Sequence, residues 1–213
     1  MKYVEGARKV FMNTGTIFPR EIIWSVALIK RSASKINASL GYLNKDVSRA
    51  VARAAEEVMQ GRHDKNVVVD VFQTGSGTGI NMNLNELIAK RASRILRKNV
   101  HPNDHVNMGQ SSNDVGPTAI RIAAISLVEA KLKPALKKFT NDLDRLSART
   151  SRVYKAGRTH LRDALPVTMG QEFGAFADAF RHDLILVEVA ADYVRELPIG
   201  GTAVGTGLNT HPS

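Results

Sequence analysis

Residues 122–146 read IAAISLVEAKLKPALKKFTNDLDRL, and residues 173–194 read FGAFADAFRHDLILVEVAADYV. In both segments apolar side chains recur every three or four residues, which is the spacing of one face of an α-helix. Glu129 is the one break in the apolar face of the first segment. Long helices with such a face are typical of helices packed nearly antiparallel in a bundle. The two segments therefore predict a mainly α-helical fold.

Two long helices cannot bury these apolar faces by themselves. Apolar surface left in water forgoes about 25 cal/mol per Å². Along helices of this length the loss would be large against a typical net stability of about 5–15 kcal/mol. We therefore expect further helices, from other sequence or from neighbouring subunits, to complete the bundle.

Shorter helices are predicted in the first half of the chain. Apolar residues at helical spacing run from Glu21 to Gly41, and Asp46 is the expected N-cap of a second helix that ends at Gly61. The β-branched run at residues 67–72 indicates an extended segment, and another apolar helical face spans 84–95. The predicted loops are residues 1–20, 99–113, 156–167 and 199–213.

Composition limits the class of protein. Hydrophobic residues make up 43% of the 213 residues, which is enough for a folded core. The chain has no cysteine, so neither a disulfide framework nor a cysteine metal site can form. Because no apolar run resembles a signal peptide or is long enough to span a bilayer, we expect a soluble cytoplasmic protein with no membrane partner.

The net charge of +10 raises the question of a nucleic-acid partner. Aromatic residues are only 6% of the chain, which leaves few platforms on which bases could stack. We therefore expect no nucleic-acid partner, and we interpret the basic residues as a solvated face. The basic residues on predicted helices include Lys30, Arg31, Lys35, Lys90, Arg91, Arg94, Lys137, Lys138 and Arg145.

Three polar segments between the helices carry dense hydrogen-bonding groups. The first, residues 74–85, is a glycine-rich turn with Ser76, Gly77 and Thr78 that leads into a helix. Its backbone N–H groups and the helix N-terminus could bind an anion. The segment has neither the Lys-Ser/Thr of a P-loop nor the spacing of a dinucleotide fingerprint. A plain turn remains the alternative interpretation.

The second segment begins with His101, Pro102, Asn103 and Asp104 and ends with Ser111-Ser112-Asn113. Two histidines and two aspartates suggest a metal site, but His101 and His105 flank a proline in a loop, so we expect no metal. The serines and Asn113 could present donors to a carboxylate at a helix N-terminus, or they could simply cap that helix.

The third segment, Gly157 to Asp163, contains Thr159 and His160. A histidine there could transfer protons, although a surface role is also possible for a lone histidine in a loop. Taken together, the three segments supply neutral donors on a frame of long helices, which suits a polar acid bound through its carboxylates.

At these segments the sequence resembles the fumarase/aspartase superfamily, and class II fumarase within it. The matching stretches are Gln73 to Thr78 with Asn81-Met82-Asn83, His101 to Asp104, Gln110 to Asp114, Gly157 to His160, and Gly200 to Thr210. Five motifs in the family's order make the resemblance specific, and together they cover nearly the whole chain. Thr159-His160, Ser111-Ser112-Asn113 and Gly200-Gly201 resemble fumarase rather than aspartase.

The resemblance implies a fold and a reaction. It implies a small, mostly helical N-terminal domain at residues 1–109 and the first part of a central helical bundle at 110–213. The reaction would be the reversible hydration of fumarate to L-malate, a step of the citric acid cycle, by a homotetramer without metal or organic cofactor. The aspartase-like ammonia lyases and a non-catalytic helical partner that still binds dicarboxylates remain alternatives.

The resemblance also assigns roles to residues. His160 would take part in proton transfer, and a secondary dicarboxylate site would contain His101, Pro102, Asn103 and Asp104. The residues implied to bind substrate are Ser76, Gly77, Thr78, Ser111, Ser112, Asn113 and Thr159. The family's basic serine lies on a loop reading Gly-Ser-Ser-x-Met-Pro-x-Lys-x-Asn-Pro, which these 213 residues do not contain. We therefore expect a fragment that is inactive alone.

Overall fold

The computed structural model describes residues 2–212. By backbone contacts the chain forms two compact units, one with the residues up to Ala123 and from Leu197 onward, the other with Ala124–Glu196. In chain order the elements are α1 (Lys2–Val10), α2 (Arg20–Ser39), α3 (Lys45–Met59), η1 (Asp64–Asn66), α4 (Thr78–Leu96), η2 (Pro102–Val106), α5 (Ser112–Leu127), η3 (Val128–Leu132), α6 (Lys133–Arg149), β1 (Tyr154–Thr159), β2 (Arg162–Thr168) and α7 (Met169–Val194). The domain boundary after residue 109 stays a prediction.

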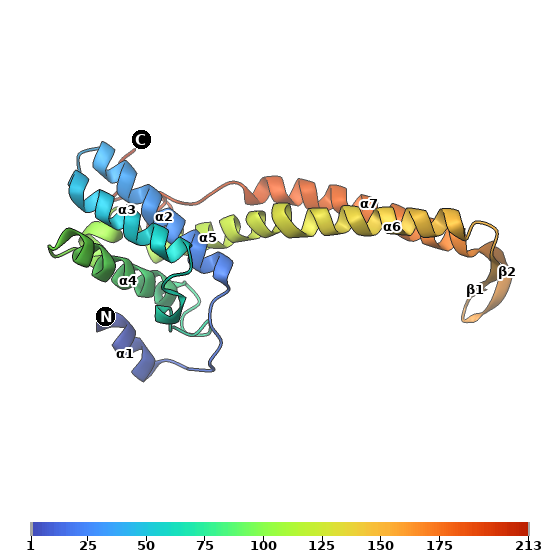
Figure 1. Cartoon of the computed structure of the whole chain (residues 1–213), viewed down its shortest axis with the longest axis horizontal. Helices are drawn as coiled ribbons and strands as arrows, with labels where there is room; N and C mark the ends of the chain where they lie inside the picture. The colour runs from blue at the N-terminus through green and yellow to red at the C-terminus, as the bar shows by residue number, and fades with distance from the viewer. Residues whose placement is uncertain (1, 213) are drawn as a thin grey trace. The chain divides into compact units, whose positions relative to one another are not determined.

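The core of the first unit lies between α2, α3 and α4, which pack side by side (Figure 1). The apolar stripes predicted from the sequence form this core: Val26, Val51, Val58, Leu84 and Ile88 are at most 1% exposed. The extended run at residues 67–72 adds Val67 and Val69 to the same cluster. The three predicted helices of this region are thus confirmed.

Two local predictions in this unit were wrong. Residues 2–10 are helical: Val4 and Ala7, at helical spacing, are buried, and Glu86 of α4 accepts hydrogen bonds from the N–H groups of Tyr3 and Val4 at 2.8 and 3.2 Å. A distant carboxylate thus binds the free N–H groups of the first turn. The N-cap of α3 is Asn44 and not Asp46, since the Asn44 Oδ1 atom accepts from the N–H groups of Asp46 and Val47.

The interpretation of the basic residues as a solvated face was wrong for Lys30, and Arg91, whose side chain is 35% exposed, forms an ion pair with a buried carboxylate. Lys30 is fully buried. Arg91 donates from Nε and Nη2 to the nearly buried carboxylate of Glu57 at 2.5 and 3.0 Å. The hydrogen bond and charge of Arg91, together with those of His63, lower the pKa of Glu57 from 4.5 to about 2 against the opposing effect of burial.

We expect Glu57→Gln to lower the free energy of unfolding by about 2 kcal/mol at pH 7, because Arg91 would lose its paired charge. The Glu57 pKa is lower in the folded chain than in the unfolded chain, so the carboxylate stabilises the fold above pH 5 and loses that effect as the pH falls toward 2. Urea unfolding across this range should therefore show the difference between wild type and variant shrinking. Glu56→Gln is the matched control, since Glu56 pairs with Arg31 at the surface.

The second unit is built on two long helices. From Ala124 this unit is helical to Arg149, with a π-helical turn at Val128–Leu132, and α7 runs beside α6 (Figure 1). Phe139 and Phe180 meet edge to face across the pair with ring centroids 5.0 Å apart. Thr168 and Gln171 form the predicted capping box at the start of α7. Both long helices predicted from the sequence are confirmed.

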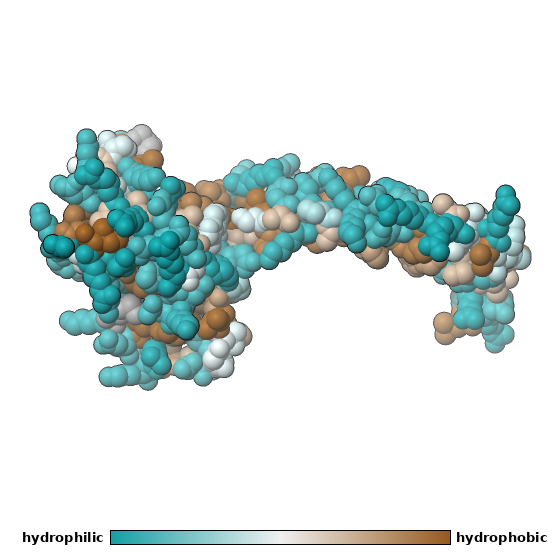
Figure 2. All heavy atoms as spheres, viewed as in Figure 1, coloured by the Kyte–Doolittle hydropathy of each residue, from teal (hydrophilic) through white to brown (hydrophobic). Residues whose placement is uncertain are grey.

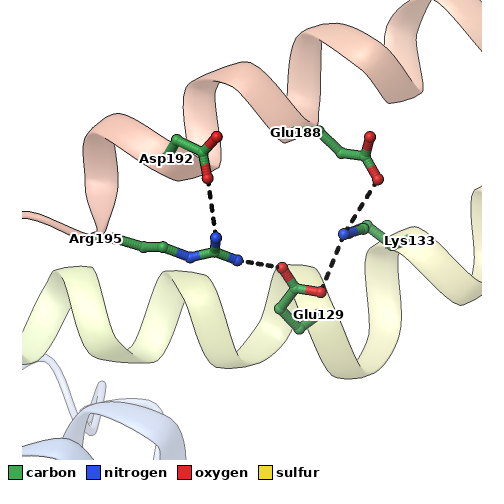
Figure 3. A network of polar contacts seen from close by, with 5 residues as sticks. All are labelled: Glu129, Lys133, Glu188, Asp192 and Arg195. Carbon is green, nitrogen blue, oxygen red and sulfur yellow. Dashed lines mark hydrogen bonds and ion pairs between the residues drawn. The ribbon is translucent and has the colours of Figure 1, made fainter.

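Glu129, the break in the apolar face, lies in a network of ion pairs (Figure 3). Its carboxylate accepts from Arg195 at 2.7 Å and pairs with Lys133 at 3.1 Å. Lys133 also pairs with Glu188 at 3.2 Å, and Arg195 with Asp192 at 2.9 Å. The pairs between α7 or its C-cap and the opposite helix set the register of the two helices where apolar contact is interrupted.

Much of the apolar surface of the helix pair is open, as the sequence predicted. Leu186 and Tyr193 of α7 are 66% and 73% exposed. Figure 2 shows hydrophobic atoms among the hydrophilic ones along these helices. None of the described helices is both long and apolar enough to cross a membrane.

The predicted loop at residues 156–167 is instead an antiparallel hairpin. Strand β1 pairs with β2 from Tyr154 opposite Thr168 to Thr159 opposite Arg162, with an irregularity after Ala156. Gly157 sits at that irregularity, where a Cβ atom would lie 2.7 Å from the carbonyl oxygen of Leu165. The turn residues His160 and Leu161 have positive φ angles of 50° and 61°. A pair of left-handed residues is the geometry that two-residue hairpin turns need, but its usual Asn-Gly signal is absent.

We expect Gly170→Ala to destabilise the second unit by about 3 kcal/mol, because overpacking a tight contact forces the backbone apart. A Cβ atom at Gly170 would lie 2.5 Å from the carbonyl oxygen of Ser147 and 2.8 Å from the Cα atom of Ser151. Thermal unfolding followed by circular dichroism is the measurement. Gly174→Ala, one turn later, meets only the Ser147 hydroxyl at 3.3 Å and should change stability by less than about 1 kcal/mol. Equal effects of the two would contradict the packing argument.

Candidate functional site

The glycine-rich turn ends at the N-terminus of α4. Gly77 has a φ angle of +70°, a left-handed conformation that glycine adopts without strain, and Thr78 begins the helix. The hydroxyl groups of Ser76 and Thr78 lie 3.0 Å apart. The first turn of α4 therefore begins with two hydroxyl groups, and the N–H group of Gly79 donates to the hydroxyl of Thr74 at 3.4 Å.

The Ser111–Asn113 turn, at the start of α5, lies beside the glycine-rich turn. The hydroxyl of Ser112, the first residue of α5, lies 3.0 Å from the hydroxyl of Thr78. The backbones are also close, since a Cβ atom at Gly116 would lie 3.4 Å from the carbonyl oxygen of Ser76. Two helix N-termini thus meet with hydroxyl groups between them, an arrangement that favours an anion.

A cavity of about 720 Å³ lies beside this meeting point. Ser76, Gly77 and Asn113 line it together with apolar residues such as Phe18 and Ile80. A mainly apolar cleft with a few polar groups at one side is typical of small-molecule sites.

The C-terminal glycine-rich segment is bound to the Ser111–Asn113 turn. Asp114 is 2% exposed, and its carboxylate accepts from the N–H groups of Ser111 and Thr202, both at 2.9 Å. The side-chain amide of Asn113 donates to the carbonyl oxygen of Ala203 at 2.8 Å. Sequence analysis gave Asp114 and Thr202 no role at the site, although both lie in the motifs that it singled out.

The residues His101 to Asp104 form a separate cluster. The His101 Nδ1 atom accepts from the N–H group of Asp104 at 3.2 Å, which begins the π-helical turn η2. Asn103 and Asp104 line a different cavity, of about 550 Å³, together with Tyr42 and His211. The second polar segment of the sequence therefore contributes residues to two different cavities, Asn113 to the first and Asn103 and Asp104 to the second.

Thr159 and His160 belong to the other compact unit. Both are exposed at the tip of the β1–β2 hairpin, and His160 is the first residue of its turn. Ser76, Thr78 and Ser112 are thus brought together within the first unit, while Thr159 and His160 lie on the second. Among residues 2–212 no three His, Asp or Glu side chains gather where they could bind a metal ion.

The comparisons with known proteins match the whole chain. The family model described as Lyase matches residues 1–213. The chain belongs to the lyase family. Its sequence is 57% identical over 212 residues to the class II fumarate hydratase of Saccharolobus solfataricus, covering 100% of this chain and 48% of that protein. It is 47% identical over 199 residues to the enzyme of the same name from Thermus aquaticus, covering 91% of this lyase chain and 43% of that protein.

Solved structures agree with the fold. The lyase chain superposes on the class II fumarase from Schistosoma mansoni with a TM-score of 0.94 at 36% identity, covering 98% of this chain and 45% of that one. The fumarate lyase:delta crystallin from Brucella melitensis gives 0.92 at 37% identity, covering 98% of this chain and 47% of that one. The predicted family and mainly α fold are confirmed. The chain spans about half the length of the curated relatives it matches.

One buried residue of this lyase was missed by sequence analysis. Lys30 is fully buried on α2, and burial lowers its pKa from 10.5 to about 7, while the charge of Asp114 opposes that change. Its position offered a signal, because Lys30 follows Val26 by four residues and precedes Ser34 by four, on the face of α2 that is buried. A lysine at such a position either extends its amino group to water or, when fully buried, is paired with polar groups.

Proposed function

We propose that this chain is part of a class II fumarate hydratase that interconverts fumarate and L-malate. The observation that carries the proposal is the 3.0 Å contact between Thr78 and Ser112, which joins the N-termini of α4 and α5. Fumarate and malate are small dianions, and neutral N–H and hydroxyl donors at two helix N-termini suit a carboxylate. The names of the relatives support the choice of substrate.

The substrate-binding groups would be Ser76, Gly77, Thr78, Ser111, Ser112 and Asn113, with Thr159 joining them in the assembled protein. These donors would hold a carboxylate of malate while a base removes a proton from the adjacent carbon. As the C–H bond breaks, charge develops on the carboxylate oxygens, and fixed donors aimed at those oxygens stabilise it. The C–O bond to the hydroxyl group then breaks, and the hydroxyl leaves as water after taking up a proton.

His160 would move protons in this reaction. An imidazole titrates near neutral pH and can act through a bound water. The base that removes the proton from carbon would come from sequence other than these 213 residues, since the serine loop of the family is not among them. His101, Pro102, Asn103 and Asp104 would form a secondary dicarboxylate site.

The assembly proposed is a homotetramer in the cytoplasm, serving the citric acid cycle without a metal or organic cofactor. The open apolar surface of α6 and α7 supports an assembly, because Leu186, Val189 and Tyr193 are all more than half exposed. Further helices against this surface would bury it.

The test of the proposed function is an assay of the intact protein encoded by the longest reading frame that contains this chain. We expect it to hydrate fumarate, followed by loss of the ultraviolet absorbance of fumarate, and the 213-residue chain alone to give no turnover. Aspartate and argininosuccinate are the competing substrates. Turnover of aspartate alone would make the protein an ammonia lyase. Dicarboxylate binding without any turnover would make it a non-catalytic partner.

In the intact protein, His160→Asn should lower kcat by about 100-fold or more, because general acid–base groups contribute about 10²–10⁴-fold. KM should change by less than about threefold, since the change removes a proton-transfer group and not a carboxylate ligand. Steady-state kinetics with malate measures both constants. His182→Asn, an exposed histidine of α7, is the control and should leave both unchanged. A change confined to KM would remove His160 from the proton-transfer role.

A further inference from the structure

Lys30 lies behind the proposed substrate turns and binds the segment that leads into one of them. Its Nζ atom donates to the Asn107 Oδ1 atom at 2.7 Å and to the Gln110 Oε1 atom at 2.9 Å. Gln110 immediately precedes Ser111. A fully buried amino group is therefore hydrogen-bonded to the residue that immediately precedes the proposed carboxylate ligands.

The two amide side chains that accept from Lys30 also close the 106–110 turn. The Asn107 Nδ2 atom donates to the carbonyl oxygen of Gln110 at 3.2 Å. The Gln110 Nε2 atom donates to the carbonyl oxygens of Val106 and Met108, both at 3.2 Å. Each amide thus uses its nitrogen to hold the turn and its oxygen to accept from Lys30, which fixes both orientations.

The same cluster reaches the other proposed substrate turn. Asn81 of α4, 3% exposed, donates from Nδ2 to the Asn107 Oδ1 atom at 3.3 Å. Asn81 lies one helical turn after Thr78. Asn107 is therefore the point at which Lys30 of α2 and Asn81 of α4 meet, and each of the two helix N-termini is connected to it.

Because Lys30 is buried, its amino group and the amide oxygens around it need hydrogen-bond partners within the protein. A buried amino group without acceptors is strongly destabilising, and a buried amide oxygen without a donor is also costly. Either protonation state of Lys30 has at least two N–H bonds to donate, so both acceptors can be satisfied. A hydrophobic residue would fill the same space on α2 but would bind neither amide. The lysine therefore specifies the conformation of the turn rather than only filling the core.

We propose that Lys30 is a positioning residue of the site, which holds the 107–110 turn and, through Asn107 and Asn81, keeps Ser111–Asn113 and Ser76–Thr78 together for binding a carboxylate. The inference rests on the proposed function. It assigns Lys30 no contact with substrate. Its effect is on the geometry of the groups that make that contact.

The first experiment uses the intact protein and compares Lys30→Met with Lys35→Met, an exposed lysine on the same helix. Lys30→Met should raise KM for malate and the inhibition constant of succinate together, each about tenfold, while kcat falls by less. Lys35→Met should leave all three within about twofold. A lower Tm with unchanged KM and unchanged succinate inhibition would show a purely structural role and overturn the inference.

Gln110→Met keeps the experiment decisive if Lys30→Met does not fold. It removes one acceptor of Lys30 from a partly exposed turn and should raise KM and the succinate constant about threefold, whereas no change in either constant would overturn the inference.

Hydrogen exchange separates this inference from the proposed function. In the intact protein, Lys30→Met should speed exchange in peptides covering 107–114 and 78–82 by about tenfold, and Lys35→Met should not. If the intact protein fails to hydrate fumarate but this exchange increases, the proposed function fails and the structural role of Lys30 stands. If exchange in both peptides is unchanged, the Lys30 inference fails whatever the protein catalyses.

Discussion

The close approach of two helix N-termini is the constraint on which the candidate site depends. Helices α4 and α5 begin within hydrogen-bond distance of each other, at Thr78 and Ser112. Two like partial charges at such ends repel, so the arrangement needs compensation. The buried Asp114 supplies negative charge beside α5, and hydroxyl groups accept as well as donate between the ends. Glycines at 77 and 116 allow the backbones to come this close.

The sequence predicted the helical frame well because apolar periodicity is a local signal. The stripe from Ile122 to Leu146 lies on α5, η3 and α6, which follow one another without a break, and the stripe from Phe173 to Val194 lies on α7. The capping box of α7 was equally local. By contrast, α1 depends on Glu86, which lies 82 residues or more from the N–H groups that it binds. The buried Val4 and Ala7 do follow helical spacing, but two apolar positions are a short signal, and the partner of the first turn lies outside any local window.

Only part of the candidate site was predicted, because the sequence shows local patterns and not contacts between distant residues. The turns with Ser76 and Ser112 were found from their composition, but their contact is a tertiary fact that composition does not contain. Lys30 was misjudged because charge suggested solvent, whereas its place on the buried face of α2 decided otherwise. The hairpin was missed since Thr159 to Arg162 lacks the glycine or asparagine that usually marks a tight turn.

The backbone conformation at the tip of the β1–β2 hairpin limits which residues can occupy positions 160 and 161. His160 and Leu161 both have left-handed backbone angles, and neither is glycine. A β-branched residue such as valine would crowd its own backbone in this conformation, so variation at the tip is confined to unbranched or small side chains. The path of the main chain through the tip, together with the rotamer of the side chain, therefore decides where the imidazole points, so a change in the length of the turn would change its direction.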